Sequence, residues 1–267
     1  MFPRLFHIGN FNLPTYGVLV ATGLIIALLV IVRLAKRNGL DPDKCWNLGV
    51  LAVLAGIVGA KILLFITDWD YYRAHPGEIF SLATLQAGGV FFGGLLGAIV
   101  VCVWYLRSNH MPGLRTADVF APGIALGHSI GRLGCFAAGC CYGKPTDLPW
   151  GVTFTNPLAH FWVGTPLGVK IHPTQLYESA VELANFALLY WLIGRKRFDG
   201  QVIGAYMAVY GFARYFLEFL RADAQRGTVF GGFMTVTQLI AIGMVVAAGV
   251  LWLRRPQPQA AMASAAR

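Results

Sequence analysis

The sequence has few charged residues for its length. Of its 267 residues, 12% are charged and 57% are hydrophobic, whereas ordinary soluble domains carry roughly 25% charged residues. This scarcity of charge excludes a typical soluble globular protein. Several apolar runs also reach the roughly 20 residues needed to cross a bilayer. We therefore predict an all-α polytopic membrane protein.

The sequence also lacks the marks of a cleaved leader and of a nucleic-acid-binding protein. Its first residues, MFPRLFHIGNFNLP, show no basic stretch followed by an apolar core and a small-residue cleavage site, so we expect the first span to be retained. The five cysteines are too scattered for a secreted disulfide framework. The net charge of +9 comes from short clusters between apolar runs, which is typical of membrane topology and argues against nucleic acid as a partner.

Seven transmembrane helices are predicted from the apolar runs. They lie at about 16–35, 46–67, 87–107, 117–134, 174–194, 201–220 and 230–253. The fourth is the least regular, because Pro122 and several glycines interrupt it. We expect residues 1–255 to form a single bundle and the low-complexity residues 256–267 to form a disordered cytoplasmic tail.

The basic residues between these spans predict the orientation. Twelve of the 21 lysines and arginines fall on one side, including the RKR run at Arg195–Arg197 and the C-terminal arginines. Six fall on the other side, and three lie within spans. Because basic residues are enriched on the cytoplasmic side, the C-terminus is predicted to be cytoplasmic and the N-terminus outside.

The long segment at about 135–171 is therefore predicted to lie at the outer face. Its Trp150, Phe154, Phe161 and Trp162 are suited to the headgroup layer, where amphipathic aromatic rings accumulate. This favours an interfacial lid, and a simple solvated loop is the alternative.

An arginine near the outer end of the fourth span indicates an anionic ligand. Arg132 follows His128 by one helical turn, so both lie on one side of the helix. No carboxylate lies one turn from Arg132, and its charge is therefore expected to be balanced by another group. The planar guanidinium matches phosphate oxygens, which makes a lipid phosphate the favoured candidate.

The sixth span carries a second polar stripe. Tyr210, Arg214, Glu218 and Arg221 recur at steps of four, four and three residues. Arg214 and Glu218 form an intrahelical ion pair in the alternative interpretation.

Four other spans are predicted to bring polar or small residues to the same depth, which indicates a polar cavity opening to the outer leaflet. These residues are Tyr16, Lys61, Gly93, Gly97, His172, Gln175 and Glu178. An ordinary interfacial position is the alternative for Tyr16. For Gly93 and Gly97 the alternative is close helix packing through a GxxxG pair.

Four segments resemble the signature of one enzyme family. PTYG, GRLGCFAAGCCYG, HPTQLYE and YGFARYFLEFLRAD are similar, in this order, to the signature segments of bacterial prolipoprotein diacylglyceryl transferases. The resemblance implies a multi-pass enzyme of the bacterial inner membrane with its active site facing the periplasm. Such enzymes transfer the diacylglyceryl group of phosphatidylglycerol to the lipobox cysteine thiol of preprolipoprotein signal peptides, forming a thioether and releasing glycerol 1-phosphate. We expect a monomer in contact with membrane lipids, with no cofactor and no metal.

The resemblance also implies roles for individual residues. Arg132 matches the arginine that binds the lipid headgroup, and Arg214 matches a second functional arginine, with Tyr210 and Glu218 beside it. We predict Arg214, His128, Glu218 and Tyr210 as catalytic residues. The predicted substrate-binding residues are Arg132, Tyr16, Gly131, Gly143, Gln175, His172, Gly93 and Gly94.

The chain departs from the family pattern at three places. Phe92 stands where the family usually has a histidine in the third span, and Cys135 stands where asparagine is common. GCCYG replaces a segment that often carries a glutamate and a tryptophan. Our hypothesis is that His128 replaces the missing base, because free histidine titrates near neutral pH. A histidine that only bonds between helices, or arginines that stabilise the thiolate alone, are the alternatives.

Three cysteines fall within the altered signature. Cys135, Cys140 and Cys141 are predicted to lie on the oxidising side, where a bridge from Cys135 to either neighbour would persist. The spacing is a weak signal for a metal, and small-residue packing is the default interpretation.

Two other functions remain open at this point. The missing histidine favours a paralogue that binds lipid or transfers it to a different acceptor. A small-anion or lipid transporter would use the same arginines, but transporters commonly contain internal repeats, and the sequence shows none.

Overall fold

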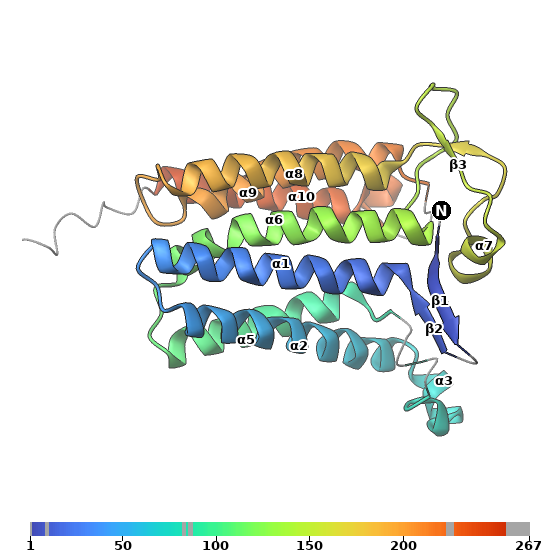
Figure 1. The fold of residues 1–267 in the computed structure, drawn as a ribbon, viewed down its shortest axis with the longest axis horizontal. Helices are drawn as coiled ribbons and strands as arrows, with labels where there is room; N and C mark the ends of the chain where they lie inside the picture. The colour runs from blue at the N-terminus through green and yellow to red at the C-terminus, as the bar shows by residue number, and fades with distance from the viewer. Residues whose placement is uncertain (1, 9–10, 82–83, 85–87, 223–226, 255–267) are drawn as a thin grey trace, which may run out of the picture. The chain divides into compact units, whose positions relative to one another are not determined.

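The computed structural model describes residues 2–8, 11–81, 84, 88–222 and 227–254. Its helices and short strands, shown in Figure 1, fall into two compact units. One unit comprises residues 1–31 and 117–267, and the other comprises residues 32–116. The predicted tail at 256–267 lies outside the described residues.

The unit of residues 32–116 is built around two helices that approach each other through glycines. A Cβ atom added to Gly93 would overlap the carbonyl oxygen of Gly59, and one added to Gly97 would lie 2.6 Å from the Ala55 oxygen. The packing predicted from the GxxxG pair is therefore confirmed. The elements of this unit, besides the end of α1 and the start of α6, are α2 (Pro42–Thr67), α3 (Trp69–Ala74), the 3₁₀ helix η1 (Pro76–Glu78) and α5 (Phe91–Ser108).

We predict that Gly93→Val will destabilise the protein by at least about 1–3 kcal/mol, the usual cost of overpacking. The added side chain must displace the backbone of α2, which cannot shift without opening the whole helix pair. Denaturation of the purified protein in detergent, followed by helix content, measures the loss. Gly243→Val in α10 is the matched control, because a Cβ there meets nothing within 4 Å. Equal losses in the two variants would contradict the packing argument.

The described part of the unit of residues 1–31 and 117–267 contains the other long helices and three two-stranded sheets. The antiparallel strands β1 (Arg4–Ile8) and β2 (Phe11–Pro14) precede α1, with Phe6 opposite Leu13. The helices are α1 (Thr15–Arg37), α6 (Gly113–Ala138), α7 (Pro157–Val163), α8 (Thr174–Ile193), α9 (Gln201–Leu220) and α10 (Val236–Leu253).

All seven predicted spans are helices in the structure. Helix α6 runs unbroken through Pro122, and α10 begins at Val236 rather than at about 230. Its late start has a local cause, because β5 (Thr228–Val229), the 3₁₀ helix η2 (Phe230–Gly232) and β6 (Met234–Thr235) come first. Thr235 and Gln238 then form a capping box that begins the helix.

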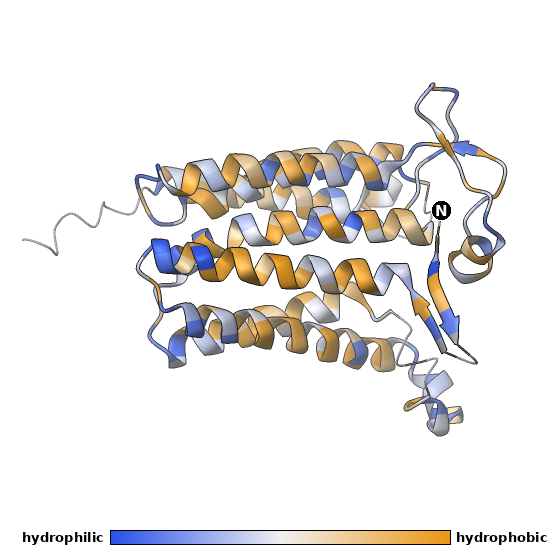
Figure 2. Ribbon diagram, viewed as in Figure 1, coloured by the Kyte–Doolittle hydropathy of each residue, from blue (hydrophilic) through white to orange (hydrophobic). Residues whose placement is uncertain are grey.

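Four of these helices, α1, α2, α5 and α10, are long and apolar enough to cross a membrane. Figure 2 shows apolar residues along most of α1 and α2. Polar residues gather near the C-terminal end of α1 and the N-terminal end of α2, the ends predicted to face the cytoplasm. Leu54, Ile57 and Ile62 on α2 are more than half exposed. Such continuous exposed apolar faces are what contact with lipid requires.

The segment predicted as a lid is partly folded. Strand β3 (Val152–Thr153) pairs with β4 (Lys170–Ile171), and α7 lies between them. Phe154 is fully buried, with its ring centroid 5.8 Å from that of Phe136, so its predicted position in the headgroup layer is wrong. Trp150 and Phe161 are exposed, which keeps them available for that layer.

Candidate functional site

Two serines lock α6 to α8 through reciprocal hydrogen bonds. Ser129 Oγ donates to the Ser179 carbonyl oxygen at 2.8 Å, and Ser179 Oγ donates to the Ser129 carbonyl oxygen at 2.9 Å. Both serines are buried. Because each hydroxyl donates to a backbone carbonyl of the other helix, these bonds fix how α6 and α8 are aligned along their length. The polar residues beside these serines therefore meet between the helices.

Glu178 of α8 is where cations from different elements meet. Its Oε1 lies 2.8 Å from Nη2 of Arg132, and its Oε2 lies 3.7 Å from Nη1 of Arg221. The Glu178 side chain is only 2% exposed, and such a carboxylate needs partners to offset its desolvation. The expectation that no carboxylate balances Arg132 is therefore wrong. The partner lies on another helix, which spacing along α6 cannot reveal.

His128 bridges the same groups. Its Nε2 accepts a hydrogen bond from Nε of Arg132 at 3.2 Å and lies 3.4 Å from Glu178 Oε1. The ring also packs edge-to-face against Tyr210, with centroids 5.3 Å apart. These contacts orient His128 within the arginine cluster.

Helix α9 supplies a second ion pair and an unsatisfied donor. Arg214 Nη2 lies 2.7 Å from Glu218 Oε2, which confirms the intrahelical pair considered from the sequence. The other terminal nitrogen of Arg214, Nη1, is buried and has no hydrogen-bond partner among the described residues. A buried guanidinium nitrogen without a partner is costly. An anionic ligand would remove that cost.

The cluster carries more positive than negative charge. Arg132, Arg214 and Arg221 face two paired carboxylates, Glu178 and Glu218. A third acid, Glu182, lies one turn beyond Glu178, and neither of its carboxyl oxygens has a partner within the described chain. Among the three arginines and the two paired carboxylates, the surplus is one positive charge, which suits a phosphate monoanion.

The backbone after α6 is held against the beginning of α8. Gly143 N donates to the His172 carbonyl oxygen at 3.0 Å, and His172 N donates to the Lys144 carbonyl oxygen at 3.0 Å. Gln175 Nε2 donates to the Cys140 carbonyl oxygen at 2.7 Å. Three predicted substrate-binding residues thus position the loop through these contacts, and their contact with a substrate stays a prediction.

We predict that Gly143→Ala will lower the unfolding free energy by about 1–3 kcal/mol. An added Cβ would lie 2.6 Å from His172 Cβ and 2.8 Å from the Leu220 oxygen, so two backbone segments must separate. Thermal unfolding in detergent measures the effect. Gly249→Ala is the control, since its Cβ would meet nothing within 4 Å. An unchanged midpoint in the Gly143 variant would show that the loop adjusts without cost.

The remaining predicted site residues fall in different surroundings. Tyr16, at the start of α1, touches α6, because a Cβ on Gly134 would lie 3.3 Å from its ring. A Cβ on Gly131 would meet nothing within 4 Å. Gly93 and Gly94 lie in the unit of residues 32–116, where both pack against α2. Their role in substrate binding stays a prediction.

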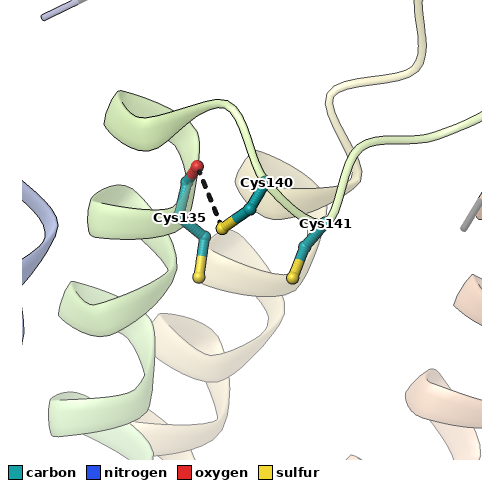
Figure 3. A group of neighbouring side chains, drawn as sticks. All are labelled: Cys135, Cys140 and Cys141. Carbon is teal, nitrogen blue, oxygen red and sulfur yellow. Dashed lines mark hydrogen bonds between the residues drawn. The ribbon is translucent and has the colours of Figure 1, made fainter. Parts of the chain in front are cut away.

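Three cysteines come together at the end of α6. The thiol sulfurs of Cys135, Cys140 and Cys141 all lie within 4.8 Å of one another, and Figure 3 shows them pointing toward a common space. They are free thiols, so neither of the bridges considered from the sequence is formed. Arg132 Nη1 lies 3.9 Å from Cys135 Sγ. Thiolate sulfurs are suitable ligands for soft metal ions, so these three cysteines are candidate metal ligands.

Two buried acids, Asp118 and Glu182, were missed by sequence reasoning. Asp118, near the other end of α6, accepts hydrogen bonds from three backbone nitrogens at the start of α9 and from Lys196 Nζ, each at 2.9 Å. It is fully buried. A single aspartate inside an apolar run was the available signal, and it marks a structural anchor for the helix that carries Arg214.

Comparison with known proteins gives a consistent result. A family model described as "Prolipoprotein diacylglyceryl transferase" matches residues 3–254. The chain is 35% identical over 251 residues to the phosphatidylglycerol–prolipoprotein diacylglyceryl transferase of Finegoldia magna, an alignment covering 93% of this chain and 94% of that protein.

Two further relatives carry the same name. The Clostridium tetani protein is 34% identical over 247 residues, covering 92% of this chain and 94% of the relative. The Vibrio cholerae protein is 34% identical over 249 residues, covering 91% and 88%.

Proposed function

The chain belongs to the prolipoprotein diacylglyceryl transferase family, and from this premise we propose that it transfers the diacylglyceryl group of phosphatidylglycerol to the thiol of a lipobox cysteine in preprolipoprotein signal peptides. A thioether forms, and glycerol 1-phosphate leaves. The observation that carries the proposal is the buried arginine cluster with one unsatisfied guanidinium nitrogen. This nitrogen, Nη1 of Arg214, is available to donate a hydrogen bond to a lipid phosphate.

The proposed setting is the bacterial inner membrane. We propose seven spans, with the N-terminus outside, the C-terminus in the cytoplasm and the active site facing the periplasm. The distribution of basic residues supports this orientation, and the apolar helices α1, α2, α5 and α10 support the membrane location. The protein acts as a monomer.

The proposed reaction is a nucleophilic substitution at the glyceryl carbon that bears the phosphate. The acceptor sulfur forms a bond to this carbon, and the carbon–oxygen bond breaks with its electron pair on the phosphate. Arg132 and Arg214 bind the phosphate and stabilise the charge that develops on it, because preorganised cations are most effective in a dry site. The residues proposed to position the lipid and peptide around them are Tyr16, Gly131, Gly143, His172, Gln175, Tyr210 and Glu218.

His128 is proposed to take the proton from the acceptor thiol. Its Nε2 faces Glu178 Oε1 at 3.4 Å, so a proton received there meets a carboxylate that stabilises the imidazolium. This arrangement lets α6 supply both a phosphate-binding group and a base one turn apart. It compensates for Phe92, which cannot accept a proton.

We predict that His128→Gln will lower the turnover rate about a hundred-fold, the lower end of the usual range for a general base. The arginines still stabilise the thiolate, which keeps the loss moderate. The pH–rate profile is the decisive measurement, because removal of a general base should change the profile and removal of a purely structural residue should not. His75→Gln, an exposed loop residue, is the control. Full activity with an unshifted profile would exclude the role.

The function is tested with purified protein, labelled phosphatidylglycerol and a lipobox peptide. We expect a thioether product with the cysteine peptide and none with the peptide in which that cysteine is serine. Product with neither peptide would contradict the proposed acceptor. Movement of lipid without any covalent product would indicate a transporter.

A further inference from the structure

We propose that Cys135, Cys140 and Cys141 hold one Zn²⁺ ion through three thiolates, and that the open fourth position of this ion receives the acceptor thiol. The site lies at the C-terminal end of α6, next to Arg132. The second part of the proposal rests on the proposed function. The first part, metal binding, stands independently.

The geometry suits a zinc ion. Zn–S bonds of about 2.3 Å place tetrahedral thiolates roughly 3.8 Å apart. The three sulfurs lie within 4.8 Å of one another, so closing around an ion needs movements of no more than about 1 Å, within reach of side-chain rotation. A disulfide would use two of the three thiols and leave the third unexplained. A metal uses all of them.

The backbone that carries the thiols is held in place from outside the cluster. Thr174 Oγ1 donates to the Cys141 carbonyl oxygen at 2.8 Å, and Gln175 Nε2 donates to that of Cys140 at 2.7 Å. Thr165 Oγ1 donates to the Gly139 carbonyl oxygen at 3.0 Å. Such external support is what a preorganised ligand site requires.

The turn itself adopts an unfavourable conformation at a cysteine. Cys141 has φ +61°, following Gly139 at φ +90°. Non-glycine residues rarely adopt positive φ, and such strain clusters at functional sites. With this backbone conformation, the Cys141 thiol lies near that of Cys135 at the end of α6. Close packing of small residues alone does not require a cysteine at positive φ.

A cationic side chain lies beside the thiols, because Arg132 Nη1 is 3.9 Å from Cys135 Sγ. Three thiolates and Zn²⁺ carry one negative charge together, and such a group is compatible with a neighbouring guanidinium. Coordination also protects thiols that would otherwise oxidise outside the cytoplasm.

The proposed chemistry needs a thiolate where the family histidine is missing. A thiol that coordinates a metal is deprotonated outright, so the acceptor thiol loses its proton, which passes to His128. The bound sulfur then attacks the glyceryl carbon, the carbon–oxygen bond breaks, and its electron pair leaves with glycerol 1-phosphate. His128, Arg132 and Cys135 follow one another along one side of α6, which places base, phosphate-binding group and metal ligand in sequence.

Metal binding is tested on the full-length protein, purified anaerobically with a reductant and stripped with a chelator. Equilibrium dialysis with Zn²⁺ should give one ion per chain. The variant C135S/C140S/C141S should bind at least about 100-fold more weakly, beyond the roughly 10–100-fold lost with outer-shell changes. The matched control C45S/C102S removes two free cysteines outside the cluster and should bind like the wild type. Equal binding by the triple variant, or uptake of Cu⁺ but not Zn²⁺, would overturn the site.

A second measurement does not depend on the folding of the triple variant. Alkylation of the wild type, mapped by mass spectrometry, should modify Cys135, Cys140 and Cys141 in the stripped protein and spare all three after Zn²⁺ is added. Protection of none of them, or a disulfide between two of them in the anaerobic protein, would overturn the proposal.

The fourth position is tested with Co²⁺ in place of Zn²⁺. The sulfur-to-cobalt absorption should change when the lipobox cysteine peptide is added and should not change with the serine peptide. An unchanged spectrum with the cysteine peptide would overturn the acceptor role while leaving the metal site. A changed spectrum without covalent product in the zinc-loaded enzyme would contradict the proposed function and leave the site. Equal transfer by stripped and zinc-loaded enzyme would overturn the catalytic role of the ion.

Discussion

Replacing Arg214 by glutamine will lower kcat/KM for diacylglyceryl transfer about a thousand-fold, the upper range for loss of one charge-stabilising donor. The reason is the buried Nη1 atom, which has no partner in the described part of the protein and is available to the phosphate. Initial rates with labelled phosphatidylglycerol and the cysteine peptide measure the effect. Arg195→Gln is the matched control, because Arg195 stacks on Trp191 at 4.7 Å, outside the cluster.

The same substitution removes an ionic partner of Glu218, so a loss of folding must be separated from a loss of catalysis. The double variant R214Q/E218Q removes both charges of this ion pair and should recover thermal stability without recovering activity. If the double variant regains near-wild-type activity, Arg214 serves only to balance Glu218. In that case the proposed contact with phosphate is wrong.

Asp118→Ala will lower the unfolding free energy by about 3–5 kcal/mol, the range for breaking a buried ion pair. The substitution leaves the backbone nitrogens of Gly200, Val202 and Ile203 without their acceptor. It also removes one of the two carboxylates that accept from Lys196 Nζ. Denaturation in detergent, followed by helix content, measures the loss. Asp43→Ala, an exposed position in α2, should change stability by less than about 0.5 kcal/mol. A small effect at Asp118 would mean that water replaces the carboxylate.

The helices were predictable because apolar runs dominate the sequence. Each predicted span has a helix at nearly its expected place, since a backbone in an apolar environment must satisfy its own hydrogen bonds. The short elements were not predictable. The hairpin β1–β2, the strands flanking α7 and the turn before α10 depend on backbone pairing between short segments, which hydropathy does not report.

The candidate site was predictable in its residue types more than in its contacts. The spacing of four residues correctly predicted the Arg214–Glu218 pair and the position of His128 beside Arg132. The position of Glu178 between Arg132 and Arg221 was not found, because it depends on the register that Ser129 and Ser179 impose on two helices. Contacts between helices come from packing, and periodicity describes only one helix at a time.

The cysteines show the same limit of sequence reasoning. Their C-x₄-C-C spacing resembles no common metal motif, and packing of small residues was the simplest interpretation. The structure brings the three thiols together through the positive φ of Gly139 and Cys141. A conformation that a cysteine rarely adopts cannot be anticipated from propensity.

The central claim is that arginines on separate helices bind one phospholipid headgroup, and lipid binding by the purified protein tests it most directly. Native mass spectrometry in mixed detergent micelles compares phosphatidylglycerol with zwitterionic phosphatidylethanolamine. We predict that the wild type and the control R195Q/R254Q retain phosphatidylglycerol selectively, and that R132Q/R214Q, folded by its helix content, loses this preference. Selective retention of phosphatidylglycerol by folded R132Q/R214Q at the wild-type level would contradict the claim.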